Sequence, residues 1–388
     1  MKKRMLIYRL VILSVVSFVG LTVTAANAAS SSKSQPSKTT TITDTNQNWD
    51  SLIAAAKKEG TVLIYNTAWT SKLRTNLTQA FKAKYGINIE FSPFGRGGEL
   101  LAKTQSEQRA GLHLVDVFGC GSNTLLTLLK PAGLLGALEP MLVLPEVTDG
   151  KNWQTGRVPF VDKDKTFIGM ISSLRRNIFY NTDMIKKGEI IDYPDLLKPQ
   201  YKGKITMNDP TVTGAGSDFM IHLAVNIWDI SKAKDYLTQL VGRQQANIQR
   251  DNRLQVEEVA KGKYPIGIAP NADHMVVLLN SGAHLDVVYL KRGERVTAAA
   301  GAIGVPNKSP HPNATKLFVN WLLSKEGQVV YSKGFGNPSL RKDVPTDGFY
   351  QMFLPQPGEK VFPDSEDFLN QTPEVLRMAK NVIDATNK

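Results

Sequence analysis

From residue 49 onward, short apolar runs alternate with amphipathic stretches. "WDSLIAAAKKEG" has helical spacing, begins with an aspartate cap and ends at Gly60, and the apolar run "TVLIYNT" follows it. The same order recurs in "TNLTQAFKAKYG" before "INIEFSPF", and in "GELLAKTQSEQRAG" before "LVDVFG". Helices that alternate with short buried strands are typical of α/β folds. We therefore predict an α/β protein whose sheets are mostly parallel and flanked by helices.

A second block of the same kind follows later in the chain. It opens with "KITMND", continues through "YPIGIAPNADH" and ends near "LDVVYL". Between the blocks lie "TFIGMISSLRRNIFYNTDMI" and, on the return, "AAAGAIGVP". Two blocks joined by two extended segments predict two lobes with a hinge.

The first 28 residues have the pattern of a secretory signal peptide. A basic start, "MKKRMLIYR", precedes the apolar stretch "LVILSVVSFVGLTVTA" and the small residues that end at Ala28. A short membrane anchor is the alternative, but the apolar stretch is below the roughly 20 residues that span a bilayer. We expect cleavage near Ala28 and a periplasmic location for the mature protein.

Charge and cysteine content limit the possible partners. The single cysteine, Cys120, rules out an internal disulfide. The net charge of +12 includes four basic residues in the signal segment, so the mature chain carries +8. Lysines and acids are interleaved along helices, so we expect no nucleic-acid partner. A net positive charge of this size is compatible with an anionic ligand.

These patterns divide the chain into five predicted segments. The polar, Ser- and Thr-rich stretch after the signal cannot bury enough apolar surface to fold, so we expect a flexible tether there. The predicted segments are a signal peptide at 1–28, a tether at 29–48, the first part of lobe 1 at 49–170, lobe 2 at 171–300, and the second part of lobe 1 with C-terminal helices at 301–388.

Loops of small and polar residues follow the predicted strands, where ligands bind in such sheets. In lobe 1 they are "AWTSK", "GRGGE" and "GCGSN". In lobe 2 the stretch "NDPTVTGAGSDFM" places Gly214 and Gly216 just before an apolar helix that Ser217 or Asp218 can cap. Backbone N–H groups at such a helix start favour an anion. A turn that uses glycine only for its geometry is the alternative.

Several segments, in order, resemble one protein family. They are "GTVLIYNT", "LVDVF" with "PAGLLGALEP", "IFYNTDMI", "KGKITMNDPTVTGAGS", "GIAPNADH" and "ATKLFVNWLLSKEGQVVYSKGFGNP". Together they resemble the extracellular solute-binding proteins of ABC importers, in the branch that contains ferric-iron, thiamine and phosphonate binders. The resemblance implies the two-lobed type II periplasmic binding protein fold, capture of a ligand by hinge closure, and delivery to an ABC permease in the membrane. It also implies a monomer.

The metal ligands of the iron-binding members have no counterpart in this sequence. The resemblance puts Trp69 at the position of their histidine, Gly121 at their glutamate, and Ala272 and Asp273 at their two tyrosines. Ferric iron prefers hard oxygen donors, and one aspartate is a poor replacement for them. We expect Asp273 and His274 on a strand, where successive side chains point to opposite faces, so they do not chelate a metal together. We therefore predict no metal site and no cofactor.

The anion-holding part of the family pattern is retained. The resemblance implies that an acidic group is held by the second-lobe residues Thr213, Gly214, Ala215, Gly216, Asn252 and Asn271. From the first lobe we add Trp69 as an aromatic face, Arg96 as a planar fork for a carboxylate or phosphonate, and Ser122 as a polar contact. Asp273 completes the predicted ligand-binding set. Arg175 and Arg176 lie in the first crossing segment, where one can point toward the ligand while its neighbour points away.

The predicted function is thus capture of a small organic anion of the carboxylate or phosphonate type. Three alternatives remain: a ferric-iron or iron-chelate binder of the same fold, a ligand sensor for a membrane receptor, and an enzyme. For the enzyme, the sequence contains no HExxH pair, GxSxG elbow or P-loop, and we predict no catalytic residues.

Overall fold

The computed structural model describes residues 42–298 and 300–386, with side chains from residue 48 onward. The predicted signal peptide and its cleavage site near Ala28 lie outside the described residues. Helix α1 (Ile42–Glu59) begins within the predicted tether, so that prediction is wrong for residues 42–48. The apolar face of α1 around Ala56 packs into the first lobe, and a helix fixed in this way extends through neighbouring polar residues at little cost.

The first sheet has the strand order β2-β1-β3-β12-β4. In that order the strands span Asn88–Phe94, Thr61–Thr67, Val117–Cys120, Ala302–Gly304 and Phe167–Gly169. Strand β1 pairs in parallel with β2 and β3, whereas β12 runs antiparallel to β3 and β4. The predicted α/β fold is confirmed, but the sheet is mixed rather than mostly parallel, because the chain returns to it from the second lobe in the opposite direction.

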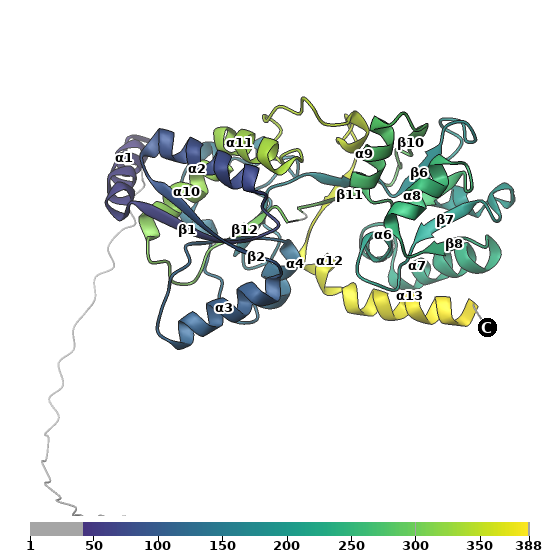
Figure 1. Ribbon diagram of the computed structural model, residues 1–388, viewed down its shortest axis with the longest axis horizontal. Helices are drawn as coiled ribbons and strands as arrows, with labels where there is room; N and C mark the ends of the chain where they lie inside the picture. Colours follow the sequence, from purple (N-terminus) through teal and green to yellow (C-terminus); the bar gives the residue numbers. More distant parts are fainter. Residues whose placement is uncertain (1–41, 299, 387–388) are drawn as a thin grey trace, which may run out of the picture. The chain divides into compact units, whose positions relative to one another are not determined.

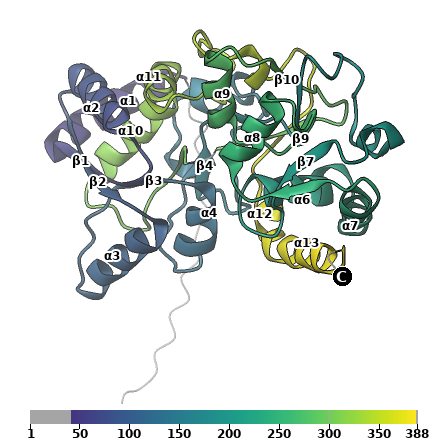
Figure 2. The same cartoon turned by 45° about the vertical axis from the view of Figure 1, so that its right-hand side comes forward.

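Helices cover both faces of this sheet. Helices α2, α10 and α11 lie on one face and α3 on the other (Figures 1 and 2). The helices of this lobe after α1 span Ser71–Tyr85 (α2), Gly97–Arg109 (α3), Ser122–Thr124 (α4), Pro145–Thr148 (α5), Pro312–Leu323 (α10) and Lys325–Phe335 (α11). Each of α2, α3 and α4 follows the carboxyl end of a strand, so their first turns lie at the edge where ligands bind in α/β sheets.

The second sheet has the strand order β10-β6-β9-β7-β8. Its strands span Leu285–Val287, Ile178–Asn181, Ile266–Ile268, Ile205–Asn208 and Asn247–Gln249. Strand β7 is parallel to β8 and β9, and β6 is antiparallel to β9 and β10. The helices here span Ala215–His222 (α6), Ile230–Thr238 (α7), Asn252–Ala260 (α8) and Ala272–Asn280 (α9). Helices α6, α8 and α9 begin just beyond β7, β8 and β9.

A small third sheet, the hinge sheet, joins the two lobes. It consists of β13 (Val361–Pro363), β11 (Glu294–Thr297) and β5 (Ser173–Arg175), in that order. Strand β5 lies between β4 of the first sheet and β6 of the second, as predicted for the first crossing. The return crossing is β11 instead of the predicted "AAAGAIGVP", which supplies β12. The polar stretch "ERVT" is buried here because its charged side chains find partners.

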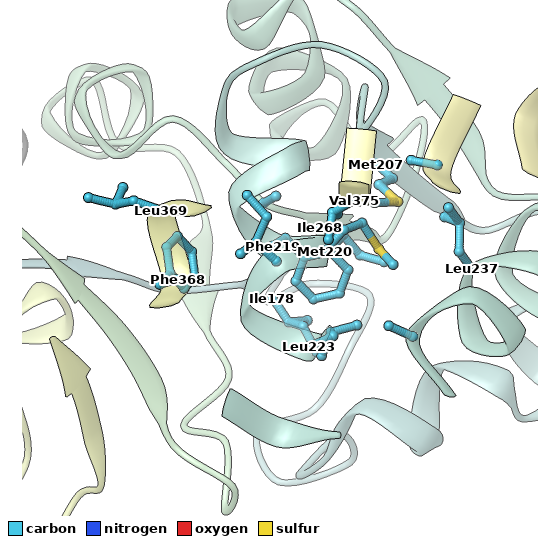
Figure 3. Packing of buried hydrophobic residues seen from close by; sticks show 14 of the residues in the cluster. Ile178, Met207, Phe219, Met220, Leu223, Leu237, Ile268, Phe368, Leu369 and Val375 are labelled. Carbon is cyan, nitrogen blue, oxygen red and sulfur yellow. The ribbon is translucent and has the colours of Figure 1, made fainter. Parts of the chain in front are cut away.

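After β13 the chain forms α12 (Glu366–Asn370) and α13 (Thr372–Thr386). Helix α13 packs on α6 and α7 of the second lobe, which lie beside it in both views (Figures 1 and 2). Figure 3 shows Val375 of α13 beside Met207 and Met220 in the shared core. Among the described residues, no helix is both long enough and apolar enough to cross a membrane.

Candidate functional site

A small pocket lies where the hinge sheet meets the strand ends of the second lobe. It is lined by Arg175, Arg176, Asn177, Ala215, Asp218, Ala269, Pro270 and Arg295, and we call it the Arg175 pocket. Its volume of about 10 Å³ accommodates roughly one water molecule, so it receives an atom or two of a ligand rather than a whole ligand. Strand β5, the first turn of α6 and the loop after β9 meet there.

Arg175 ends β5, and its side chain is partly buried. Its Nε atom is buried, and no hydrogen bond or ion pair connects the side chain to any residue that the structure describes. Burial lowers the pKa of Arg175, and the positive charge of Arg295 lowers it further, against the opposing effect of nearby aspartates. A cation in this state has lost part of its hydration without gaining a partner. The pocket therefore contains a cation suited to an incoming anion.

The neighbouring arginine is used differently. Arg176 points to the opposite face of β5 and forms an ion pair with Glu359. Its Nε and Nη2 atoms donate to the carbonyls of Met352 and Leu354, at 2.6 and 2.8 Å. The ring of Tyr289 lies 4.7 Å from the guanidinium carbon. Arg176 thus anchors the segment before β13, and the alternation predicted for the two arginines places Arg175 at the pocket.

Arg295 in β11 lies directly opposite Arg175 in the hinge sheet. Its Nη1 atom is 2.8 Å from Asp218 in α6, and its Nη2 atom is 2.5 Å from Asp364, just after β13. Burial lowers the pKa of Arg295, but the two carboxylates outweigh this effect and raise it. Asp364 also accepts hydrogen bonds from the Ser122 hydroxyl and the Ala298 amide, each at 3.1 Å. This network links both lobes to the hinge sheet.

The predicted glycine loop forms one wall of the pocket. Gly216 is required by packing, because a Cβ there would lie 2.3 Å from the carbonyl oxygen of Asn208. Its amide donates to the Asn208 side chain, and the Gly214 amide donates to the Ser217 hydroxyl. Gly214 has open space around it. The alternative interpretation, a turn that uses glycine only for its geometry, therefore explains Gly216. Gly214 and Ala215 leave room beside the pocket.

The loop after β9 forms the facing wall. Ala269 has a φ of 58°, in the left-handed region that costs an alanine of order 1 kcal/mol. Such strain is concentrated at functional sites. Asn271 then caps α9, accepting from the amides of Asp273 and His274 at 3.0 and 3.3 Å. These residues are helical, so the expectation that Asp273 and His274 lie on a strand is wrong: the Asn271 cap starts a helix directly after Pro270.

The remaining second-lobe residues have mixed environments. Asn252 lies in the first turn of α8, and its side chain accepts a hydrogen bond from Asn208 at the end of β7. Thr213 and Asp273 are exposed. Of the predicted ligand-binding residues, the structure places Ala215 in the pocket lining; Gly214 precedes it in the chain, and Asn271 follows Pro270 of the lining.

Trp69 does not offer the open aromatic face that we predicted. The side chain is 2% exposed, packs on Phe91 and Tyr331, and donates from Nε1 to the Ala300 carbonyl at 3.2 Å. Gly119 makes this possible, because a Cβ there would lie 2.5 Å from the indole ring. The prediction fails because the same glycine-rich loop that suggested room for a ligand makes room for the tryptophan.

The other two first-lobe candidates differ from each other. The Ser122 hydroxyl is buried and bonded to Asp364, so it belongs to the hinge network rather than to an open polar contact as predicted. Arg96 is exposed at the start of α3, without a hydrogen bond or ion pair among the residues the structure covers. Asn66 near the end of β1 is buried, and both polar atoms of its amide lack partners within the described chain. Sequence reasoning missed Asn66, because buried amides have no periodic signature, and it considered Asp218 only as a helix cap.

Larger hollows exist outside this region. One of about 460 Å³ is lined by Lys163 and Lys165, which form ion pairs with Asp367 and Glu139. Another of about 470 Å³ includes Arg250, which pairs with Asp209. Such pairs already satisfy these charges. In the part of the chain that the structure describes, no group of three or more His, Cys, Asp or Glu side chains is placed to hold a metal ion.

Sequence comparison identifies the family. A family model described as bacterial extracellular solute-binding protein matches residues 76–353. The chain belongs to this family. Its members are the solute-binding components of ABC importers, which act outside the cytoplasm. A relative from Haemophilus influenzae, an uncharacterized protein, is 26% identical to this solute-binding protein over 288 residues, which cover 71% of this chain and 76% of the relative.

Solved structures confirm the two-lobed type II fold. The Trichodesmium protein IdiA (FutA), in complex with iron and citrate, is similar with a TM-score of 0.66 at 19% identity, over 83% of this chain and 99% of that one. Ferric iron-binding protein A of Mannheimia haemolytica, in an open conformation, gives 0.66 at 19% identity over 84% and 98%. The periplasmic binding protein AfuA of Actinobacillus pleuropneumoniae, with fructose-6-phosphate bound, gives 0.53 at 21% identity over 84% and 98%.

Proposed function

We propose that this solute-binding protein captures a small organic anion, of the carboxylate or phosphonate type, and delivers it to an ABC permease. The observation that carries the proposal is the partly buried Arg175 side chain, which lines a pocket and has no hydrogen-bond or ion-pair partner among the described residues. A planar guanidinium binds carboxylate and phosphonate oxygens through two parallel hydrogen bonds. The acidic group of the ligand supplies the partner that Arg175 lacks.

The position of Arg175 connects ligand binding with closure of the lobes. It is the last residue of β5, in the hinge sheet that both lobes share. The adjacent network runs from Ser122 in the first lobe through Asp364 and Arg295 to Asp218 in the second. An anion on Arg175 lies within this region of charge. Binding there favours the hinge arrangement in which the guanidinium is neutralised.

Iron is the main competing ligand, because several similar structures are ferric-binding proteins. Their identity to this chain is about 20%, so they support the fold rather than the ligand. At the two positions where the family's iron binders carry adjacent tyrosines, this chain has Ala272 and Asp273, in the first turn of a helix. AfuA was solved with a sugar phosphate, so this fold also accommodates an organic anion. A phosphate ester therefore belongs in the test panel beside carboxylates and phosphonates.

The test is a thermal-shift screen of the purified protein against carboxylates, phosphonates, phosphorylated metabolites and ferric citrate. Ligand that binds only the folded state adds RT ln(1 + [L]/Kd) to stability, so a micromolar binder at millimolar concentration gives about 4 kcal/mol. We expect a shift with an organic anion, and we expect Arg175→Gln to weaken that ligand at least 30-fold by calorimetry.

Arg109→Gln is the matched control, because Arg109 is an exposed arginine at the end of α3, remote in sequence from the pocket. It should bind the ligand within twofold of the unchanged protein. A thermal shift with ferric citrate alone, or undiminished affinity in Arg175→Gln, would contradict the proposal.

A further inference from the structure

One outer edge of the second sheet is formed by β8, which pairs in that sheet with β7 alone. The Asp209 amide donates to the Gln249 carbonyl at 3.0 Å, so the backbone groups of Gln249 point toward β7. Successive residues of a strand direct these groups to opposite sides, so the N–H and C=O of Ile248 point away from the sheet. Among the described residues, no group outside the β7–β8 pair bonds to them. Ile248 therefore offers one donor and one acceptor to a further strand.

The edges of the first sheet are protected against such pairing. The Asn88 amide bonds to the residue before β1, so by the same alternation the backbone of Pro93 in β2 points outward, where a missing N–H costs no ladder bond. Glu90 of that strand is exposed. At the opposite edge, Phe160 bridges Ile168 of β4 and covers it. Strand β8 contains neither proline nor a charged residue, so its edge lacks these forms of protection.

A hollow of about 470 Å³, which we call the β8 groove, lies along this open edge, and α13 forms its opposite wall. Its volume is in the usual range of binding sites. The side chains of Ile248 and Ile383 pack partly against the hydrophobic core, so the groove has an apolar component on both sides. An extended peptide can add to an exposed sheet edge as a further strand, with main-chain bonds for affinity and alternate side chains for specificity. The β8 groove has the parts that this mode of binding needs.

The charged rim of the groove favours an acidic segment. Asp209 is buried and already accepts from Thr211 and Arg250. Arg250 pairs with it through Nε alone, its side chain is 85% exposed, and its two outer nitrogens have no partner among the described residues. Lys380 on α13 is also exposed, and its nearest carboxylate, that of Asp384, is 3.5 Å away. Because the chain as a whole is basic, an acidic partner complements both the rim and the protein.

We infer that the β8 groove is a docking site for a partner protein, which adds an extended acidic segment to the second sheet beside β8. The backbone of that segment bonds to the N–H and C=O of Ile248. One of its acidic side chains binds the outer nitrogens of Arg250, and alternate apolar side chains contact Ile248 and Ile383. The groove shares no lining residue with the Arg175 pocket, so this inference goes beyond the proposed function and does not depend on it.

The test measures binding of a fluorescein-labelled peptide, acetyl-Glu-Val-Glu-Val-Glu-amide, to the purified protein by fluorescence anisotropy. Two further peptides carry N-methyl groups on one or the other alternate set of backbone amides, which blocks hydrogen bonding along one edge of the peptide without changing its charge. We expect saturable binding that one N-methylated peptide loses by about tenfold or more, because each lost hydrogen bond costs about 1 kcal/mol, while the other binds as before. Equal binding of both N-methylated peptides, or no saturable binding of the parent peptide, would overturn the proposal.

Ile248→Pro removes the outward N–H without removing a bond to β7, so it should weaken the parent peptide about tenfold. Ile248→Val keeps that N–H and is the matched control, which should bind within about twofold of the unchanged protein. Arg250→Gln should also weaken the peptide, whereas Arg109→Gln should not. Undiminished binding by Ile248→Pro would contradict strand addition. A dimer of the unchanged protein in sedimentation equilibrium, lost in Ile248→Pro, would assign the groove to a second copy of this chain and overturn the acidic partner.

Discussion

The two arginines that face each other in the hinge sheet have opposite environments. Arg295 and Arg175 are in register on neighbouring antiparallel strands, so their side chains leave the sheet on the same face. Arg295 has two carboxylate partners and the ring of Phe368 at 3.9 Å. Arg175 has no such partner in the described chain. The comparison teaches that a residue's partners, rather than its type or its strand, decide whether it supports the fold or receives a ligand.

The largest expected effect is a loss of stability when Arg295 is replaced. Arg295→Met leaves Asp218 and the buried Asp364 without their cation, and breaking a buried pair in this way costs about 3–5 kcal/mol. The free energy of unfolding, measured by urea titration, should fall by that amount. Arg292→Met is the control: it removes a half-exposed pair with Asp192, so its loss should be below about 1 kcal/mol. Equal losses in the two variants would show that the Arg295 network contributes no more than a surface pair.

A smaller effect is expected from pH. His222 in α6 packs on Phe362 of β13, and its Nε2 donates to the Gly293 carbonyl just before β11. Burial lowers the pKa of His222 to about 3, an effect that the charge of Arg295 reinforces. Because the folded pKa is below the unfolded value of about 6.5, stability is complete above pH 6.5 and is lost as the pH falls toward 3.

Between pH 7 and pH 5, His222 should therefore account for a loss of about 2 kcal/mol in the free energy of unfolding. His222→Gln should lack this part of the pH dependence, so the difference between the two curves isolates it. Parallel curves for the two proteins would mean that the imidazole gains its proton in the folded state, and that α6 and the hinge sheet are less tightly packed than described.

The smallest expected effect, a change in stability when Arg175 is replaced, distinguishes the role of Arg175 from that of Arg295 most directly. Without ligand, Arg175→Met removes a partly desolvated charge that has no partner in the described residues, so the free energy of unfolding should rise by roughly 1 kcal/mol. A variant that gains stability while losing affinity marks a residue kept for binding. Destabilisation comparable to that of Arg295→Met would instead assign Arg175 to the structure of the hinge.

Sequence patterns predict the lobes better than the site. Alternating helices and strands indicate the α/β fold, and the stretch around Arg175 indicates the first crossing, because periodicity and strand composition are local properties. Whether the Trp69 ring is buried depends on Gly119, which is distant in sequence and adjacent in space. The helix at Asp273 depends on the Asn271 cap, which the strand interpretation overlooked. Which of the two arginines is left without a partner depends on Glu359, which pairs with Arg176 from 183 residues further along the chain.

The contribution of Asp364 also bears on the order in which this protein is completed. Chains are made from the N-terminus, so earlier residues become available for folding first. Strands β5 and β11 are available once residue 297 has emerged, but the carboxylate that connects Arg295 to Ser122 comes 69 residues after Arg295. The helices of the first lobe are all made by Phe335, whereas the joint at Asp364 and helix α13 of the second lobe both come later. A chain interrupted between α11 and β13 would therefore have the helices of its first lobe, but neither a secured pivot nor the helix that covers α6 and α7.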